Sequence, residues 1–167
     1  MRIMIAGCGF VGEPLRQRLQ AGGHEVIGLT LSGAPGIEAC DISKLDDVEA
    51  LAGRVGGFDA IVHCAASGRG AGDRAGRYRA VYLEGSQNLL TVFPSDDLLF
   101  MRRYSVFAQT DGGLVDEFSP EEPSAETGMI LRESEELALG GGGTVVRVAG
   151  IYGPGRSFIL KRFLEGE

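Results

Sequence analysis

The sequence predicts an α/β fold in which a doubly wound parallel sheet carries helices on both faces. Apolar runs of strand character alternate with segments of helical spacing along the chain, a pattern typical of parallel sheets with right-handed crossovers. Glycine is abundant, at 27 residues, which suits a fold with many tight strand-to-helix turns. The expected strands span residues 3–6, 25–30, 37–40, 59–66, 98–101 and 144–148.

Helical spacing fills the segments between these strands. The expected helices span residues 12–21, 44–54, 78–93 and 121–139, and a short helix follows Pro154. Glycines end the first and the last of the four long helices, as is common at helix C-termini. Ser43 is a candidate N-cap for the helix over 44–54, because its hydroxyl can accept from a free backbone N–H.

A glycine motif directly follows the first strand. Gly7, Gly9 and Gly12 form G-x-G-x-x-G between an apolar strand and a helical pattern, which is the context that gives this motif meaning. Gly7 permits the tight turn, Gly9 lets the backbone approach a pyrophosphate, and Gly12 lets the helix pack close to the strand. The helix N-terminus then offers unpaired N–H groups to phosphates. The motif predicts a Rossmann-type nucleotide site, against the alternative of a glycine turn with no ligand.

The carboxyl ends of the strands indicate where a ligand would bind. In an open parallel sheet, ligands bind beyond these ends, at the point where the strand order reverses. Five segments are expected to converge there: residues 7–12, 30–32, 41–42, 64–67 and 103–107.

Composition limits the classes of partner. A net charge of −7 argues against a nucleic-acid or anionic-membrane surface, where a basic excess is expected. No apolar run approaches the ~20 residues needed to span a bilayer, and the N-terminus carries no signal-peptide pattern. The three cysteines lack zinc-type spacing and read as small core residues. We therefore expect a reduced, cytoplasmic protein.

Several motifs in order along the chain resemble one known family. The matching segments are Gly7-Cys8-Gly9-Phe10-Val11-Gly12, Cys40-Asp41-Ile42, Phe58-Asp59-Ala60-Ile61-Val62-His63-Cys64-Ala65-Ala66, Glu84-Gly85-Ser86-Gln87-Asn88-Leu89-Leu90, Val115-Asp116-Glu117 and Arg147-Val148-Ala149-Gly150-Ile151-Tyr152-Gly153-Pro154-Gly155-Arg156. On these segments the chain resembles the extended short-chain dehydrogenases/reductases, and within them the NAD-dependent epimerase/dehydratase family. The resemblance implies an NAD(P)-binding Rossmann-type domain.

The resemblance also implies roles for individual residues. The loop of Gly7, Gly9, Phe10, Val11 and Gly12 would hold the pyrophosphate. Asp41 and Ile42 would contact the adenine, although Asp41 alone also fits a solvated turn aspartate. Cys64, Ala65 and Ala66 would line the ribose and nicotinamide path. Thr30, at the end of the second strand, and Tyr104, near the nicotinamide, complete the set of cofactor-binding candidates.

The choice between NAD and NADP stays open at this point. An acid at the end of the second strand would bind the ribose hydroxyls of NAD, and an arginine would pair with the extra phosphate of NADP. The sequence has Leu29-Thr30-Leu31-Ser32 there, which contains neither an acidic residue nor an arginine.

The catalytic pattern of the family is missing. The resemblance implies a Ser, a Tyr and a Lys four residues after that Tyr, but no Tyr of this chain has a Lys four positions on. Threading the motif places Arg103, Thr127 and Leu131 at the three positions. The catalytic residues are therefore unassigned, with Tyr104 as a substitute acid and a packed tyrosine as the alternative. His63 reads as a hydrogen-bonded structural histidine.

Three functions remain in consideration. The first is an NAD(P)-dependent enzyme acting on a sugar-nucleotide-like substrate through non-standard residues; the second is a non-catalytic NAD(P)-binding sensor or scaffold. The third is a subunit without cofactor. The resemblance implies that family members continue into a substrate lobe, so residues 1–167 are expected to form one NAD(P)-binding domain with that lobe largely absent. It also implies a homodimer through residues 78–93 and 124–139.

Overall fold

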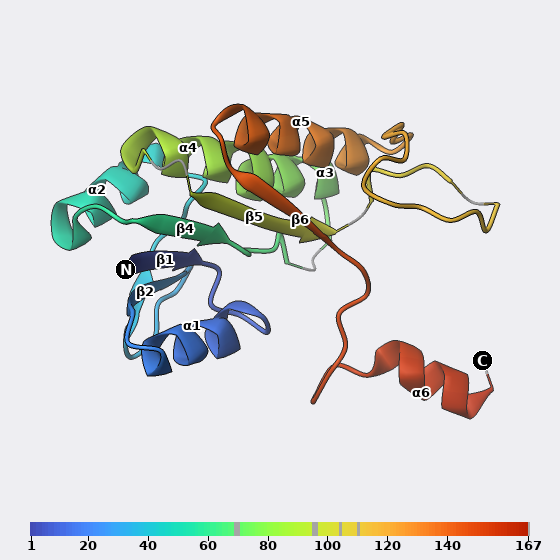
Figure 1. Ribbon diagram of the computed structural model, residues 1–167, viewed down its shortest axis with the longest axis horizontal. Coiled ribbons are helices and arrows are strands. Elements are labelled where there is room, and N and C mark those ends of the chain that lie inside the picture. Colours follow the sequence, from blue (N-terminus) through green and yellow to red (C-terminus); the bar gives the residue numbers. More distant parts are fainter. Residues whose placement is uncertain (69–70, 95–96, 104, 110, 167) are drawn as a thin grey trace.

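Six parallel strands form the single sheet seen in the computed structural model, which describes residues 1–68, 71–94, 97–103, 105–109 and 111–166. The strands are β1 Arg2–Ala6, β2 Glu25–Thr30, β3 Ile37–Ala39, β4 Ala60–His63, β5 Leu98–Arg103 and β6 Thr144–Val148. Their spatial order is β3-β2-β1-β4-β5-β6, so the order reverses between β1 and β4 (Figure 1). The predicted doubly wound parallel sheet is confirmed.

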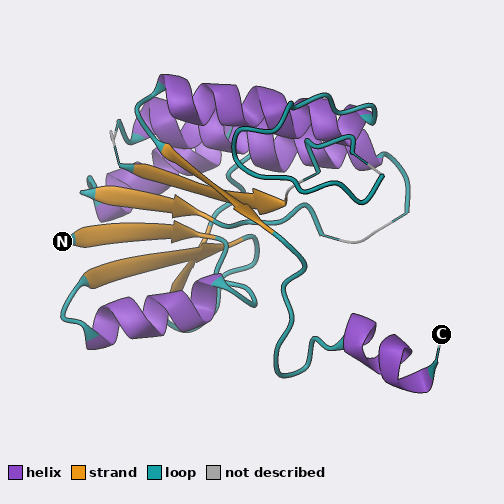
Figure 2. Cartoon of the chain, turned by 45° about the vertical axis from the view of Figure 1, so that its right-hand side comes forward, coloured by secondary structure: helices purple, strands orange, loops and turns teal. Residues whose placement is uncertain are grey.

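Helices lie on both faces of this sheet. They are α1 Gly12–Ala21, α2 Leu45–Val55, α3 Arg74–Tyr78, the π-helical turn η1 Arg79–Glu84, α4 Gly85–Val92, α5 Glu126–Gly140 and α6 Phe158–Glu165. Figures 1 and 2 show α1 beneath one face, with α2, α4 and α5 above the other; α6 lies apart from the sheet. None of the helices in the described ranges is long and apolar enough to cross a membrane.

Most predicted boundaries agree with the structure within a few residues, and β6 agrees at both ends. The helix predicted over 78–93 begins earlier, at Arg74, because the Asp73 side chain caps it by accepting from the Gly76 N–H. The helix predicted from residue 121 begins only at Glu126, since Pro123 disfavours helical backbone just before it. The N-cap role predicted for Ser43 is wrong: its hydroxyl donates to Asp41 Oδ1 at 2.7 Å, and Lys44 occupies the cap position.

Two apolar clusters hold the layers together. The larger lies between the sheet and α2, α4 and α5, and includes Met4, Leu89, Phe100 and Leu131. The smaller lies under α1 and is built from residues of the same strands, Ile3, Ile5, Val26 and Val62, together with Cys8 of the following loop. Because central parallel strands bury both faces, β1 is apolar throughout its interior, as its sequence predicts.

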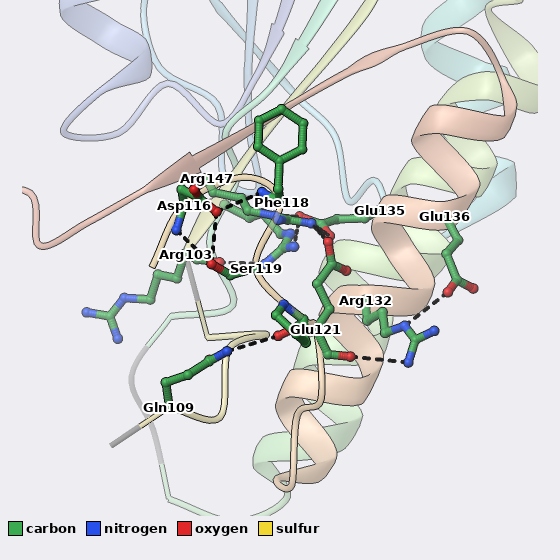
Figure 3. Close-up of polar contacts among 12 residues, drawn as sticks. Arg103, Gln109, Asp116, Phe118, Ser119, Glu121, Arg132, Glu135, Glu136 and Arg147 are labelled. Carbon is green, nitrogen blue, oxygen red and sulfur yellow. Dashed lines mark hydrogen bonds and ion pairs between the residues drawn. The ribbon is translucent and has the colours of Figure 1, made fainter. Parts of the chain in front are cut away.

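A buried group of charges joins α5 to the last two strands. Arg147 of β6 donates in a bidentate arrangement to Glu135 of α5, at 2.8 and 2.7 Å, and also pairs with Glu121 (Figure 3). Arg102 of β5 pairs with the same Glu135, and both side chains are almost fully buried. Burial, and then the nearby Arg147, lower the pKa of Arg102 to about 9. The two carboxylates compensate the two guanidinium groups, so that α5 is held over β5 and β6.

We predict that Glu135→Gln destabilises the protein strongly, because it leaves two buried guanidinium groups with one carboxylate. The expected loss in the free energy of unfolding is about 3 kcal/mol, measured by urea denaturation. The matched control is Glu136→Gln, whose carboxylate pairs with Arg132 on the exposed side of α5 (Figure 3) and should change stability by less than about 0.5 kcal/mol. Equal losses in the two variants would contradict the assignment.

The predicted homodimer through residues 78–93 and 124–139 stays a prediction. On the outer side of α5, Met129 and Leu139 are about half exposed, at 52% and 54%. An interface there would cover them.

Candidate functional site

A cavity of about 660 Å³ opens at the carboxyl ends of the strands, where the order reverses between β1 and β4. Among the residues predicted to bind the cofactor, those that line the cavity are Gly7, Gly9, Phe10, Val11, Thr30, Asp41, Ile42, Cys64, Ala65 and Ala66. Gly12 does not line it, and Tyr104 lies outside the described residues. The structure therefore brings together segments from four strand ends.

Gly7 turns the chain off β1 against the exit of β4. Its φ of 107° lies in the region that favours glycine, and a Cβ there would be 2.3 Å from the Ala65 nitrogen. The N–H groups of Gly7 and Cys8 donate to the Leu29 carbonyl at 3.0 and 2.9 Å. The two strand ends and the loop are thus fixed at contact distance, with no room for a side chain.

Gly9 and Gly12 face different surroundings. A Cβ on Gly9 would meet nothing within 4 Å, so this stretch of backbone is open to an approaching group. A Cβ on Gly12 would lie 2.1 Å from the Gly7 carbonyl oxygen and 2.9 Å from Cys64 Sγ. Since α1 begins at Gly12 and its N-cap Val11 lines the cavity, the loop forms a cradle of the kind that accepts phosphates. This geometry agrees with the turn and packing roles predicted for Gly7 and Gly12, and the pyrophosphate role of Gly9 stays a prediction.

Asp41 occupies one end of the cavity. Its Oδ1 accepts from the Ser43 hydroxyl at 2.7 Å and from the Ser43 N–H at 3.2 Å. Burial raises the pKa of Asp41, but the hydrogen bonds from Ser43 outweigh it and the net pKa is lowered. Its neighbour Ile42 is fixed through its carbonyl, which accepts from Asn88 Nδ2 at 2.9 Å. Thr30 and Leu31 line the same end and bring no charge.

The cysteines have the structural character predicted for them. Cys8 and Cys40 are buried, and Cys64 donates from Sγ to the Gly7 carbonyl at 3.2 Å. Burial, and then the nearby Cys8, raise the pKa of Cys64 to about 12, so the thiol stays protonated at neutral pH. No group of three or more potential metal ligands occurs among the described residues.

Comparison with known proteins assigns the family. Residues 3–164 match the profile of the NAD dependent epimerase/dehydratase family. The chain belongs to the NAD-dependent epimerase/dehydratase family.

Relatives with solved structures share the fold of this family member. A structure from Methylobacillus flagellatus, described as an NAD-dependent epimerase/dehydratase, is 30% identical with a TM-score of 0.79, covering 96% of this chain and 58% of its own. The UDP-glucuronic acid 4-epimerase of Bacillus cereus, solved in complex with NAD, is 22% identical with a TM-score of 0.76, over 100% of this chain and 63% of its own. The latter comparison supports the fold alone.

A curated relative is more modestly similar in sequence. Protein YeeZ of Escherichia coli K12 is 27% identical over 173 residues, which is 93% of this chain and 60% of YeeZ. This chain therefore spans about three fifths of the length of the relatives that it matches.

The residues predicted at the family's catalytic positions lie in different surroundings. Leu131, predicted at the position of the lysine, is packed in the larger apolar cluster, and Thr127 is half-buried and does not line the cavity. Arg103, predicted at the position of the serine, lies at the end of β5 and does line it. These three residues therefore do not bring together the serine hydroxyl, tyrosine phenol and lysine ammonium group of the family's pattern.

Two hydroxyl groups at the cavity were not named as cofactor-binding candidates from the sequence, although Ser67 belongs to the segment 64–67 that was expected to converge there. Tyr82 lies in η1 and lines the cavity together with Ser67, to which it is hydrogen-bonded. Burial raises the pKa of Tyr82, the hydrogen bonds to Ser67 lower it in part, and the net shift is upward. Tyr82 follows Tyr78 by four residues, a helical spacing that could have drawn attention to both rings.

His63 is structural, as predicted. It is fully buried, and its Nε2 lies 3.0 Å from the Val81 carbonyl, which can only accept, so Nε2 carries the proton. Burial lowers the pKa of His63 from 6.5 to about 4.

We predict that this histidine makes the fold less stable in acid. His63 binds a proton below pH ~6.5 in the unfolded chain, but only near pH 4 in the folded protein. The contribution of neutral His63 to the free energy of unfolding is therefore complete above pH 6.5, and it is lost as the pH falls from 6.5 to about 4. Between pH 7.5 and pH 5.0 the unfolding free energy should drop by about 2 kcal/mol. Urea denaturation of the wild type, His63→Gln and His24→Gln checks this: only His63→Gln should flatten the dependence, and an unchanged slope in that variant would contradict the assignment.

Proposed function

We propose that residues 1–167 form one domain that binds a nicotinamide dinucleotide and uses it in the oxidoreduction of a bound substrate. The observation that carries this proposal is the single cavity lined at once by the glycine loop, the end of β2, Asp41 with Ile42, and the exit of β4. A volume of about 660 Å³ falls within the range of small-molecule sites. The open backbone at Gly9 fits the pyrophosphate, and the Asp41 end fits the adenosine.

Of the two nicotinamide dinucleotides, we propose NAD as the preferred one. The extra phosphate of NADP needs a cation near the adenine ribose, and Thr30 and Leu31 supply none there. The family is described as NAD dependent, and the Bacillus cereus epimerase and Bordetella bronchiseptica WbmH were solved with NAD or NAD+. These relatives support the choice by analogy.

The nicotinamide, when bound, supplies or accepts a hydride. The residues of this chain would orient the substrate and handle its proton. Tyr82 is the candidate group, because its buried phenol stays protonated at neutral pH and can donate to a substrate oxygen. Its partner Ser67 would fix the direction of that hydroxyl. We propose a sugar-nucleotide-like substrate from the printed activities of relatives such as the Bacillus cereus epimerase.

A second candidate is a non-catalytic sensor or scaffold that binds the same cofactor. The observation that favours it is the position of Leu131, which lies in the apolar core where the family carries its lysine. A sensor would bind NADH without changing its absorbance in the presence of any sugar nucleotide, whereas an enzyme would turn over at least one of a broad panel.

We predict that Gly9→Asp abolishes NADH binding without unfolding the protein. The new side chain has open space at Gly9 but places a carboxylate where the pyrophosphate is proposed to lie. Isothermal titration calorimetry should give micromolar binding to the wild type, weaker binding of NADPH, and no detectable binding to the variant. Thermal denaturation should show similar midpoints.

The matched control is Gly53→Asp, because Gly53 lies on the exposed side of α2 and also has no atom within 4 Å of an added Cβ. It should bind NADH as the wild type does. Binding that survives in Gly9→Asp, or that is lost in both variants, would overturn the proposed site.

A further inference from the structure

The helical segment that carries Tyr82 is wider than an α-helix at that residue. The π-helical turn η1 continues α3 into α4, and at its end the Gly85 N–H donates to the carbonyl of Ala80, five residues back. In a regular α-helix this N–H would donate to the carbonyl four residues back, which is that of Val81. The wide turn therefore takes from the Val81 carbonyl the partner that an α-helix would give it. Turns of this kind are frequent at functional sites.

His63 supplies a partner for this carbonyl from β4. Its Nε2 donates to the Val81 carbonyl at 3.0 Å, and the imidazole is fully buried at the end of the strand. A buried carbonyl without a hydrogen bond costs free energy. The bond from His63 therefore stabilises the wide turn against arrangements that leave the carbonyl unpaired.

The ring of His63 also packs beside Tyr82. The two rings are nearly parallel, at 21°, with centroids 6.5 Å apart, and the buried Phe100 lies edge-on to both. Ser67, in the segment that leaves β4, is hydrogen-bonded to the Tyr82 phenol. Tyr82 is thus held at two points from β4 and its exit, through the backbone beside it and through its hydroxyl.

We propose that His63 is a positioning residue for Tyr82: by donating to the Val81 carbonyl, it holds the turn that places the Tyr82 phenol at the cavity. The inference rests on the proposed function, in which Tyr82 donates a proton to the substrate. Among the described residues, His63 is not one of those that line the cavity, whereas Val81 and Tyr82 are. His63 therefore acts on the site only through these neighbours.

The first test is the position of the proton on His63 in the folded protein. The chain has only two histidines, so nitrogen NMR of histidine-labelled His24→Gln gives the signals of His63 alone. At neutral pH these signals should show the proton on Nε2. A ring whose Nε2 carries no proton would overturn the proposal, because it has nothing to donate to a carbonyl.

The second test follows the phenol of Tyr82 by NMR with ring-labelled tyrosine, assigned by comparison with Tyr82→Phe. His63→Phe keeps an aromatic ring but has no donor, so the buried surroundings of Tyr82 should loosen. The pKa of the phenol, which burial raises in the wild type, should then fall toward the ordinary value of ~10. His63→Gln offers an amide N–H near the position of Nε2 and should restore the wild-type titration of Tyr82.

The matched control is Phe100→Leu. It removes ring packing against His63 and Tyr82 but leaves the hydrogen bond to Val81 in place. Urea denaturation should show lower stability in this variant, while Tyr82 titrates as in the wild type. The proposal fails if His63→Phe leaves the titration of Tyr82 unchanged, if His63→Gln does not restore it, or if Phe100→Leu shifts it equally.

Both NMR tests use the protein without added cofactor, so they report on His63 whether or not the proposed function holds. Failure of the proposed function appears separately, when NADH is added. NADH that does not bind, or that binds without moving the Tyr82 resonance, would contradict the role of Tyr82 at the site. Neither result would alter what the titrations say about the bond between His63 and Val81.

Discussion

The contact between the exit of β1 and the exit of β4 determines the rest of the site. The backbone at Gly7 runs so close to Ala65 that a Cβ would lie 2.3 Å from its nitrogen, and α1 starts so close to Gly7 that a Cβ on Gly12 would be 2.1 Å from the Gly7 oxygen. This close approach places the backbone of the glycine loop at the cavity that opens where the strand order reverses. A larger residue at either position would separate the strand ends and move the cradle.

Two neighbouring arginines of β5 have different roles because their side chains lie on opposite sides of the strand. Arg102 points into the layer of helices and is neutralised by the carboxylate of Glu135, so it belongs to the packing of α5 on the sheet. Arg103, the next residue, lies at the strand end and lines the cavity. The alternation of side chains along a strand thus gives neighbouring arginines one structural and one site position. Leu131, predicted at the family's lysine position, lies in the core at a place where a charge would have to be compensated.

Much of the fold could be predicted from the sequence because its signals are local. Alternating apolar segments predicted the order of elements, and the glycine spacing predicted the turn between β1 and α1. The strand ends and the family resemblance predicted the other members of the ten candidate residues that line the cavity. The π-helical turn η1 has no such local signal, and it is the element that carries Tyr82. The buried ion group depends on residues far apart in the chain, such as Glu121 with Arg147, whose meeting follows only from the assembled sheet.

The central claim is that the cavity at the ends of β1 and β4 binds a nicotinamide dinucleotide with its adenine beside Asp41 and its nicotinamide toward Tyr82. The most direct measurement is a crystal structure of the protein with NADH bound. The account predicts the pyrophosphate over Gly9 and the N-terminus of α1, the adenine beside Asp41 and Ile42, and the nicotinamide toward Tyr82. NADH bound in the reverse direction, or at another surface of the molecule, would contradict it.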